Sequence, residues 1–255
     1  VAVGESFGQQ APKRRVKLKL SLGLACLLLS VCFSLKAQGE TKVFSNINNN
    51  GSGWGSCTKC AGGENDASAY WMAKYQSSPA RDGSSADFYV SATKPYSNVL
   101  FWNKLGAQDW ATSFTWDFWV YLDSDSSGAQ NLEYDLFQFA NGQEYMFGSQ
   151  CAYGSGHWDV WNQKTGHWVQ TGLACKRFSP NVWHHIVWNV HRTSSEMYFD
   201  SLTLDGYVNT INMVEPSGPL PKGWSHSLGV QWQLDTASKA TAFHEWIDNV
   251  QLTLH

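Results

Sequence analysis

Apolar and polar residues alternate with a period of two along most of the chain, which is typical of half-buried β-strands. Runs of this kind occur at 87–92, 97–102, 113–122, 131–139, 143–149, 182–191, 196–204, 226–234 and 243–254. Turn dipeptides such as Asn141-Gly142 and Asp205-Gly206 lie between them. Many short strands at this spacing predict an all-β fold, namely a two-sheet β-sandwich or jelly roll of antiparallel strands. Only residues 61–75 are compatible with a turn or two of helix.

Aromatic residues occupy both faces of several predicted strands. In 113–122, Phe114, Trp116 and Phe118 share one face, whereas Trp119 and Tyr121 share the other. The core of a sandwich needs only one such face. Indole rings pack against the C–H faces of sugars, so the second aromatic face predicts a concave carbohydrate-binding surface. The candidate stacking residues are Trp119, Trp158, Trp161, Trp168 and Trp232.

The first 37 residues have the order of a secretory signal peptide. A basic run from Lys13 to Lys19 precedes the apolar stretch 20–35, and the small residue Ala37 follows. Cleavage after Ala37 is expected, with an uncleaved membrane anchor or a lipid anchor at Cys32 as alternatives. Residues 38–55 are expected to form a polar lead-in, and residues 56–255 are expected to form one β-sandwich domain with a sizeable core.

Removal of the signal peptide makes the protein more acidic. The whole chain has 18 Lys and Arg against 21 Asp and Glu, for a net charge of −3. The first 37 residues contain six of the basic and one of the acidic residues, so the net charge of the rest is −8. An acidic surface disfavours nucleic acid and anionic membranes as partners. The sequence therefore predicts a secreted protein, extracellular or periplasmic, with no membrane association after cleavage.

Four cysteines remain after cleavage, and export into an oxidising compartment favours disulfides. The tripeptide Gly-His-Trp occurs at 156–158 and again at 166–168, on either side of a turn-like sequence. A hairpin centred near Gln163 places Trp158 opposite Trp168 and sets the last two cysteines opposite each other. The expected disulfides are Cys151–Cys175 and a local Cys57–Cys60 link. A zinc site is the alternative, but a second CxxC is missing.

Three stretches in the second half of the chain resemble one superfamily. NVWHHIVWNVHR at 181–192 is followed by MYFDSLTLDG at 197–206, and EWIDNVQLTL at 245–254 is similar to a closing strand. Together they resemble the concanavalin A-like lectin/glucanase superfamily, especially its laminin-G-like members. The resemblance covers about 180–254, with compatible strand patterning from about 85, and implies a β-sandwich. It implies no single activity, because the fold serves lectins, hydrolases and lyases alike.

The strand NLEYDLFQF, at 131–139, resembles the catalytic strand of laminarinase-like hydrolases of glycoside hydrolase family sixteen. Those enzymes carry Glu-x-Asp-x-Glu or the bulged Glu-x-Asp-x-x-Glu. The resemblance gives Glu133 the place of the nucleophile and Asp135 that of its partner. The acid/base place falls on Phe137 or, in the bulged form, on Gln138. Neither donates a proton as a carboxylic acid does, so the retaining mechanism lacks one of its two groups.

Other residues are candidates for the missing chemistry. A hydrolase would draw its acid from Glu144 or Glu245, and Asp235 is a further carboxylate in a predicted strand. A polysaccharide lyase needs a base and groups that neutralise a uronate. Residues of those types are Tyr145, Gln138, Arg192 and His191. They form no recognisable lyase pattern, and an acidic protein is a poor host for an anionic polymer.

No cofactor and no metal-dependent site are predicted. His184, His185 and His191 alternate between the faces of one strand, so a structural role is favoured over metal ligation. A structural calcium ion suits this fold. Carboxylates with the right chemistry, but without a diagnostic loop spacing, are Asp123, Asp125, Asp200 and Asp205.

The sequence favours a secreted carbohydrate-binding, lectin-like protein over an enzyme, because the acid/base place is empty. The expected partner is a neutral or weakly charged polysaccharide or oligosaccharide. Its hydroxyl groups are expected to bind to Glu133, Asp135 and Gln138 on a concave face. A β-glucanase-like glycoside hydrolase is the main alternative, with Glu133, Asp135, Glu144 and Glu245 as its catalytic candidates. The third possibility is an adhesive or structural surface protein whose Trp residues serve only the core.

Overall fold

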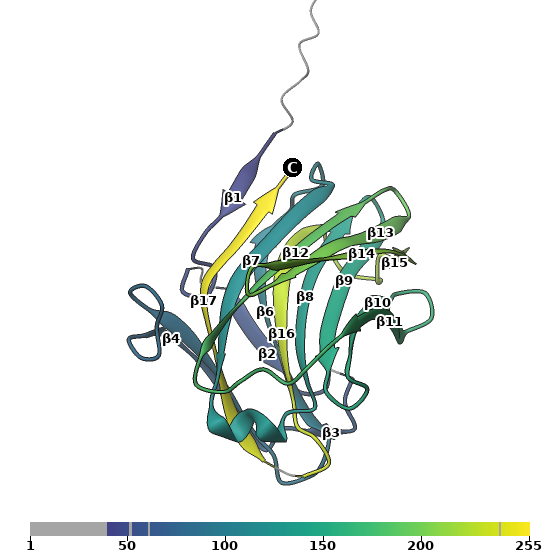
Figure 1. Ribbon diagram of the computed structural model, residues 1–255. Coiled ribbons are helices and arrows are strands. Elements are labelled where there is room, and N and C mark those ends of the chain that lie inside the picture. Colours follow the sequence, from purple (N-terminus) through teal and green to yellow (C-terminus); the bar gives the residue numbers. More distant parts are fainter. Residues whose placement is uncertain (1–39, 51–52, 61, 240) are drawn as a thin grey trace, which may run out of the picture. The chain divides into compact units, whose positions relative to one another are not determined.

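The computed structural model describes residues 40–50, 53–60, 62–239 and 241–255. They form two β-sheets packed face to face, and within these ranges the only helical element is a short 3-10 turn, η1, Ser124–Gly128 (Figure 1). The strand pairs are antiparallel, apart from one short parallel pair. The predicted all-β sandwich is therefore confirmed.

Sheet A consists of seven strands, each hydrogen-bonded to the next, and one short strand beside them. In spatial order they are β14 (Tyr207–Pro216), β13 (Glu196–Leu204), β12 (Trp183–Arg192), β7 (Ser113–Leu122), β17 (Ala242–Leu254), β5 (Ser85–Ser91) and β4 (Ala69–Gln76). The short strand β1 (Lys42–Phe44) pairs with β17.

Sheet B carries the cleft described below. In spatial order its strands are β11 (His167–Ala174), β10 (His157–Asn162), β9 (Gln143–Ala152), β8 (Asn131–Ala140), β16 (Ser227–Asp235), β6 (Ser97–Gly106) and β2 (Trp54–Cys57). Two short strands flank it: β15 (Gly218–Pro219) pairs with β9, and β3 (Asn65–Asp66) pairs with β6 in parallel.

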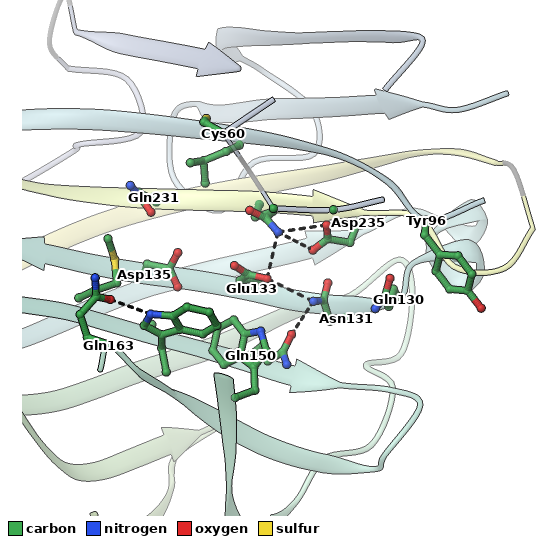
Figure 2. Close-up of a pocket in the computed structure, with 18 of the residues that line it drawn as sticks. Cys60, Tyr96, Gln130, Asn131, Glu133, Asp135, Gln150, Gln163, Gln231 and Asp235 are labelled. Atoms are coloured by element: carbon green, nitrogen blue, oxygen red, sulfur yellow. Dashed lines mark hydrogen bonds between the residues drawn. The ribbon is translucent and has the colours of Figure 1, made fainter. Parts of the chain in front are cut away.

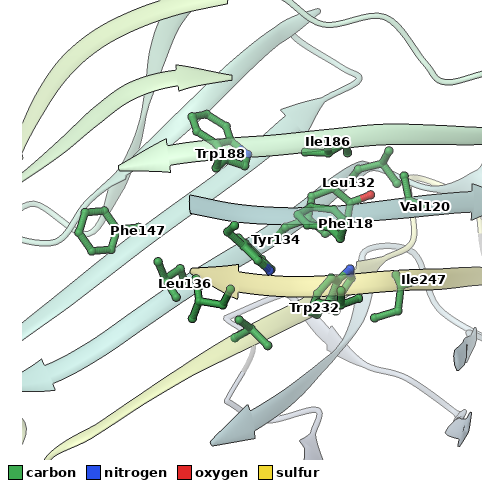
Figure 3. Packing of buried hydrophobic residues seen from close by; sticks show 14 of the residues in the cluster. Phe118, Val120, Leu132, Tyr134, Leu136, Phe147, Ile186, Trp188, Trp232 and Ile247 are labelled. Atoms are coloured by element: carbon green, nitrogen blue, oxygen red, sulfur yellow. The ribbon is translucent and has the colours of Figure 1, made fainter. Parts of the chain in front are cut away.

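Alternation along the strands decides which side chains enter the core between the sheets. In β7, Phe114, Trp116 and Phe118 are buried, whereas the intervening residues are partly exposed, as predicted. Trp232 of β16 lies in this core, with its ring centroid 5.1 Å from that of Trp116 and 5.3 Å from that of Phe118. Figure 3 shows Trp232 beside Phe118. The contacts are edge-on, an arrangement that aromatic pairs prefer over a direct face-to-face sandwich. This packing fixes β16, and with it the neighbouring β8, against sheet A.

The N-terminal part of the described chain belongs to the sandwich. Residues 42–44 pair with β17, and Trp54 begins β2, so part of the segment expected as a polar lead-in contributes strands to both sheets. The predicted signal peptide, 1–37, lies outside the described residues. The helical turn considered for 61–75 is wrong, because residues 69–76 form the edge strand β4. No helix among the described residues has the length and apolar character needed to cross a membrane.

Both expected disulfides are present. Cys57–Cys60 joins residues whose Cα atoms are 5.9 Å apart, and Cys151–Cys175 spans 5.5 Å. The second bond links β9 to the residue after β11, so it ties both ends of the β10–β11 hairpin to the centre of sheet B.

The register predicted for that hairpin is wrong. Trp168 lies opposite Trp161, not Trp158, because the turn is centred one to two residues later than Gln163. A bulge between His157 and Asp159 then shifts the pairing further, so that His157 lies opposite Ala174. The consequence is that Trp161 and Trp168 share one face, whereas Trp158 points into the core.

Candidate functional site

A cleft of about 580 Å³ opens on the face of sheet B that is turned away from sheet A. Alternate residues of β8, β9 and β16 form its floor, and the β10–β11 hairpin forms one wall (Figure 2). Cys60, residues 62–64 and Tyr96 contribute to the other wall. Its central residues are Asn131, Glu133, Asp135, Gly148, Gln150, Trp161, Trp168, Gln231, Gln233 and Asp235. We call this surface the cleft face of sheet B.

Three carboxyl groups meet on the floor of the cleft. Glu133 and Asp135 are two residues apart on β8, so both point to the same side. Asp235 comes from the end of β16 and is hydrogen-bonded to the Glu133 carboxyl. All three side chains are at least nine-tenths buried. The sandwich thus holds three acidic groups in one partly desolvated cluster.

Burial and mutual repulsion keep protons on this cluster. Desolvation raises the pKa of Asp135 to about 7, the N–H of Ser149 lowers it, and the charge of Asp235 raises it again. Burial raises the pKa of Asp235 to about 6, against hydrogen bonds from Gln233 and Glu133 that favour its charged form. The pKa of Glu133 lies well above its usual range, because of burial and the charges of both aspartates. Burial and the neighbouring aspartates therefore favour the protonated form of Glu133.

Amide side chains surround the carboxyl groups and orient them. Gln233 on β16 donates to Glu133 Oε2 at 3.2 Å and to Asp235 Oδ1 at 3.1 Å. Asn131 donates to Glu133 Oε2 at 3.3 Å and to Gln150 Oε1 at 2.6 Å. These bonds occupy one oxygen of Glu133 and fix its direction. Such a set of fixed donors and acceptors is suited to binding sugar hydroxyl groups.

Asp135 keeps one oxygen free. Its Oδ1 accepts the backbone N–H of Ser149 at 3.2 Å, and no described residue bonds to its Oδ2. Gln231, next to Asp135 across the β8–β16 pairing, also makes no side-chain hydrogen bond within the described chain. The floor therefore presents one carboxyl oxygen and one amide that are unused by the protein itself.

Two indole rings form the wall beside Asp135. Trp161 and Trp168 face each other across the β10–β11 hairpin, with ring centroids 5.1 Å apart and an interplanar angle of 68°. Gly148 permits their approach: a Cβ atom there would lie 2.7 Å from Trp161 Cβ and 3.3 Å from Asp135 Oδ1. The Nε1 of Trp161 donates to Gln163 Oε1 at 2.7 Å, which holds the ring in place. The result is an aromatic wall next to a carboxyl group.

Cationic side chains are missing from the cleft lining in the described part of the chain. The lining includes the acidic residues Glu64, Glu133, Asp135, Glu144 and Asp235, but no Lys, Arg or His. Among the described residues, no three His, Cys, Asp or Glu side chains are arranged to hold a metal ion. The cleft is thus an acidic site in which no basic side chain of the described chain neutralises the carboxyl groups.

The expectation that Gln138 shares this face is wrong. β8 and β9 pair without a register shift from Asn131 to Ala140, so no bulge brings residue 138 to the side of Glu133. The Gln138 side chain is fully buried on the opposite side. Its Nε2 donates to the carbonyl groups of Gln108 and Ala111, and its Oε1 accepts from Arg192. Gln138 is a structural link between β8 and β12.

Three of the five expected stacking residues lie outside the cleft. Trp158 and Trp232 are buried in the core, since their positions on β10 and β16 have the opposite parity to the cleft residues. Trp119 lies on the outer face of sheet A, stacked between His185 and Arg81. Trp161 and Trp168 are the two that line the cleft.

The proposed alternative acids are separated from Glu133. Glu144 lines the far end of the cleft, but Glu133 pairs with Gln150, six residues away along β9, which corresponds to about 20 Å. Glu245 is buried in the core, and its desolvation raises its pKa to about 8. A pair of glycosidase carboxyls is separated by about 5–9.5 Å. Of the carboxylates considered, only Asp135 and Asp235 are neighbours of Glu133.

The other predicted polar residues take part in local structure. Asp123 accepts the N–H of Ser126 at the start of η1, and Asp205 accepts from the backbone N–H of His185. His191 contacts Asp200 at 2.8 Å. Asp125 lies exposed in η1. Tyr145 donates to the carbonyl of Ser194 and lies in the core, away from the cleft.

The sequence interpretation missed most of the amide residues of the site. Asn131, Gln150, Gln231 and Gln233 belong to no motif, and amides are common on strands. One pattern could have revealed them. The residues of 131–135 and 231–235 that share parity with Glu133 are all polar, which is unusual for strands flanked by aromatic residues.

Comparisons with known proteins agree with this architecture. A laminin-G-type family model, described as the Concanavalin A-like lectin/glucanases superfamily, matches residues 82–242. No curated protein matches the sequence. Among solved structures, the cellulose-induced protein Cip1 is 8% identical, with a TM-score of 0.52, over 82% of this chain and 96% of that chain. The alginate lyase Aly36B is 11% identical, with a TM-score of 0.51, over 84% and 96%, respectively.

At these identities, the two structures demonstrate a shared fold and nothing about a shared activity. The family match covers more than half of the chain and includes the strands that form the cleft floor. The chain belongs to the concanavalin A-like lectin/glucanase superfamily.

Proposed function

We propose that this protein is a secreted carbohydrate-binding protein that holds a segment of a non-anionic polysaccharide in the cleft of sheet B. The observation that carries the proposal is the aromatic wall of Trp161 and Trp168 beside a floor of fixed amide and carboxyl groups. Indole rings bind the C–H face of a sugar, and the polar floor binds its hydroxyl groups. The superfamily, which includes lectins and glucanases, supports carbohydrate binding or processing.

The charge of the cleft supports the exclusion of anionic polymers. Five acidic residues and no basic ones line it within the described chain. A uronate carboxylate placed there would meet like charges without a cation to neutralise it. Although this protein shares its fold with an alginate lyase, we therefore expect it to bind a different class of polysaccharide. Secretion is supported by the two disulfides, which form and persist in oxidising compartments.

A binding panel tests this proposal. Affinity electrophoresis and pull-down with insoluble glycans are expected to show retention by neutral or amino polysaccharides, but not by alginate. Trp161→Ala removes half of the aromatic wall and is expected to abolish the retention. Trp71→Ala, on the exposed edge of sheet A, is the matched control. Absence of retention by every glycan would contradict the proposal.

Glycoside hydrolysis is the second candidate function, and one observation favours it. Burial and the neighbouring aspartates favour the protonated form of Glu133, and Asp135 lies two residues away with its pKa raised to about 7. A protonated carboxyl group close to an ionisable one is the composition of a glycosidase acid and base. In this arrangement Glu133 is the acid rather than the nucleophile that its motif implies. Release of new reducing ends that disappears in Glu133→Gln would replace pure binding with hydrolysis.

A further inference from the structure

We propose that the cleft selects a polysaccharide with free amino groups, and that a sugar ammonium group binds between Asp135 and the Glu133–Asp235 pair beside the aromatic wall. This inference rests on the proposed function and specifies its ligand. The amino group takes the place of the missing basic side chain.

The first argument is the charge balance of the site. Two aspartates outside the cleft have a histidine partner: Asp87 contacts His244 at 3.0 Å, and Asp117 contacts His185 at 2.7 Å. In the cleft, the donors to Glu133, Asp135 and Asp235 are amide side chains, a backbone N–H and the carboxyl shared by Glu133 and Asp235, with no cation among the described residues. Buried acids are normally paired with a charge or a metal. A ligand that supplies a cation would give this cluster of three acids the charged partner that it lacks within the described chain.

The second argument is geometric. Asp135 is only 6% exposed, yet its Oδ2 has no hydrogen-bond partner among the described residues and belongs to the cleft floor (Figure 2). An ammonium group has three donors and no acceptor. It can donate to Asp135 and to the acidic pair at the same time, without leaving an unused acceptor of its own. A neutral hydroxyl group offers a single donor.

The third argument comes from the aromatic wall. Trp161 and Trp168 converge on Gly148, which lies directly opposite Asp135 in the β8–β9 pairing. A cation next to Asp135 is therefore also close to the indole rings, which attract positive charge through their π-systems. An amino sugar satisfies the two requirements together, because its ring stacks on indole while its ammonium group reaches the carboxyls.

The protonation of the cluster gives this ligand a measurable signature. Desolvation raises the pKa of Asp135 to about 7 and that of Asp235 to about 6, so near pH 6 the cluster retains protons. The other ionisable groups on this face are acidic as well: Asp159 on β10, Glu64 in the loop and, farther along the cleft, Glu144 on β9. A bound ammonium group stabilises the carboxylates and lowers these pKa values. Binding near pH 6 therefore releases protons to the buffer.

Calorimetry with two matched oligosaccharides tests the inference. At pH 6 and low salt, hexaglucosamine is expected to bind about tenfold or more tightly than hexa-N-acetylglucosamine, because charge-assisted hydrogen bonds are the stronger ones. The heat of binding is expected to depend on the ionisation enthalpy of the buffer only for hexaglucosamine. Asp135→Asn is expected to remove most of the preference while neutral sugars still bind. Asp125→Asn, at an exposed carboxyl outside the cleft, is the control.

The outcomes separate the inference from the function on which it rests. Equal affinity for the two hexasaccharides overturns the inference and leaves polysaccharide binding intact. Equally tight binding of a hexalysine peptide also overturns it, because the site then recognises charge and not an amino sugar. No binding of amino, acetylated or neutral oligosaccharides refutes both. If Asp135→Asn does not fold, Asp235→Asn, at another acid of the same cluster, is expected to reduce the preference partially.

Discussion

The two outward faces of the sandwich are built from the same residue types, but they use them differently. On the outer face of sheet A, acids and aromatic rings satisfy each other. His185 contacts Asp117 at 2.7 Å and lies parallel to the ring of Trp119 at 4.4 Å. His191 contacts Asp200 at 2.8 Å and stacks on Tyr198. On the cleft face of sheet B, the acids have no such partners and the rings of Trp161 and Trp168 line an open space.

The difference shows that aromatic and acidic composition alone does not mark a binding site. Partnered acids beside stacked rings form a closed network that has little left to offer a ligand. Where acidic side chains lack cationic partners and indole rings line an open cleft, a bound ligand can supply the missing interactions. The four predictions below test this contrast, from the largest expected effect to the smallest.

Both disulfides belong to sheet B, and the longer one holds the wall of the cleft. Cys151→Ala with Cys175→Ala opens a link of sequence separation 24, for which loop entropy gives a loss of about 3.5 kcal/mol in unfolding free energy. Cys57→Ala with Cys60→Ala opens a separation of 3, with a loss of about 2 kcal/mol. Urea denaturation measures both values. A larger loss at the short link would contradict the assigned role of the long one.

Removal of one ring from each face contrasts the two surfaces directly. Trp168→Ala is expected to weaken glycan binding by about thirtyfold or more, as for a residue at the centre of a binding site. Trp119→Ala, on the outer face, is expected to leave the affinity unchanged, since its ring already stacks on His185 and Arg81. Isothermal titration with an oligosaccharide retained by the protein provides the comparison. Equal losses in the two variants would remove the distinction between the faces.

The acidic cluster is expected to make stability depend on pH. The pKa of Asp135 is raised to about 7 in the folded state, above the usual value of 3.8, so the folded state binds more protons than the unfolded chain between these values. Stability therefore falls as pH rises through that window. Asp135→Asn keeps an acceptor for Ser149 without the charge. It is expected to be more stable than the native protein at pH 8, on the order of 2 kcal/mol, and similar at pH 4.

The control for that experiment lies on the outer face. Asp117→Asn removes the partner of His185, but both side chains are partly exposed, so the change in unfolding free energy is expected to stay below about 1 kcal/mol. Glycan affinity is expected to remain unchanged. Thermal unfolding at pH 6 and 8 with parallel binding measurements checks both statements. If Asp117→Asn changed the pH dependence of stability as much as Asp135→Asn does, the paired acids of sheet A would determine that dependence instead of the acids of the cleft.

The fold was largely predictable because its determinants are local. Alternation and turn residues specify strands such as β7, whose buried positions match the predicted face. Cysteine spacing and the expectation of export predicted both disulfides, even though the hairpin register assumed for one of them was wrong. A four-residue turn and a bulge between His157 and Asp159 shift that register, and neither leaves a clear trace in the sequence.

The site was predictable only in part, because it depends on which strands become neighbours. Glu133, Asp135, Trp161 and Trp168 were identified by type and parity. Gln138 was misplaced because the bulged motif was laid on a strand that has no bulge. Trp119 was misplaced because alternation does not tell to which sheet a strand belongs. Gln233 and Asp235 reach Glu133 across a pairing between strands one hundred residues apart, which no local pattern encodes.

The absence of a side chain at Gly148 determines how much space the cleft has beside Asp135 and the two indole rings. Any side chain at this position enters the space in which Trp161, Trp168 and Asp135 meet, starting with a Cβ atom 2.7 Å from that of Trp161. A series from Gly to Ala, Ser and Val at residue 148 therefore provides graded obstruction of one binding subsite, with the acids and the core of the sandwich left in place. Substitution at this one position can therefore change how bulky a glycan the cleft accepts, without adding a new functional group.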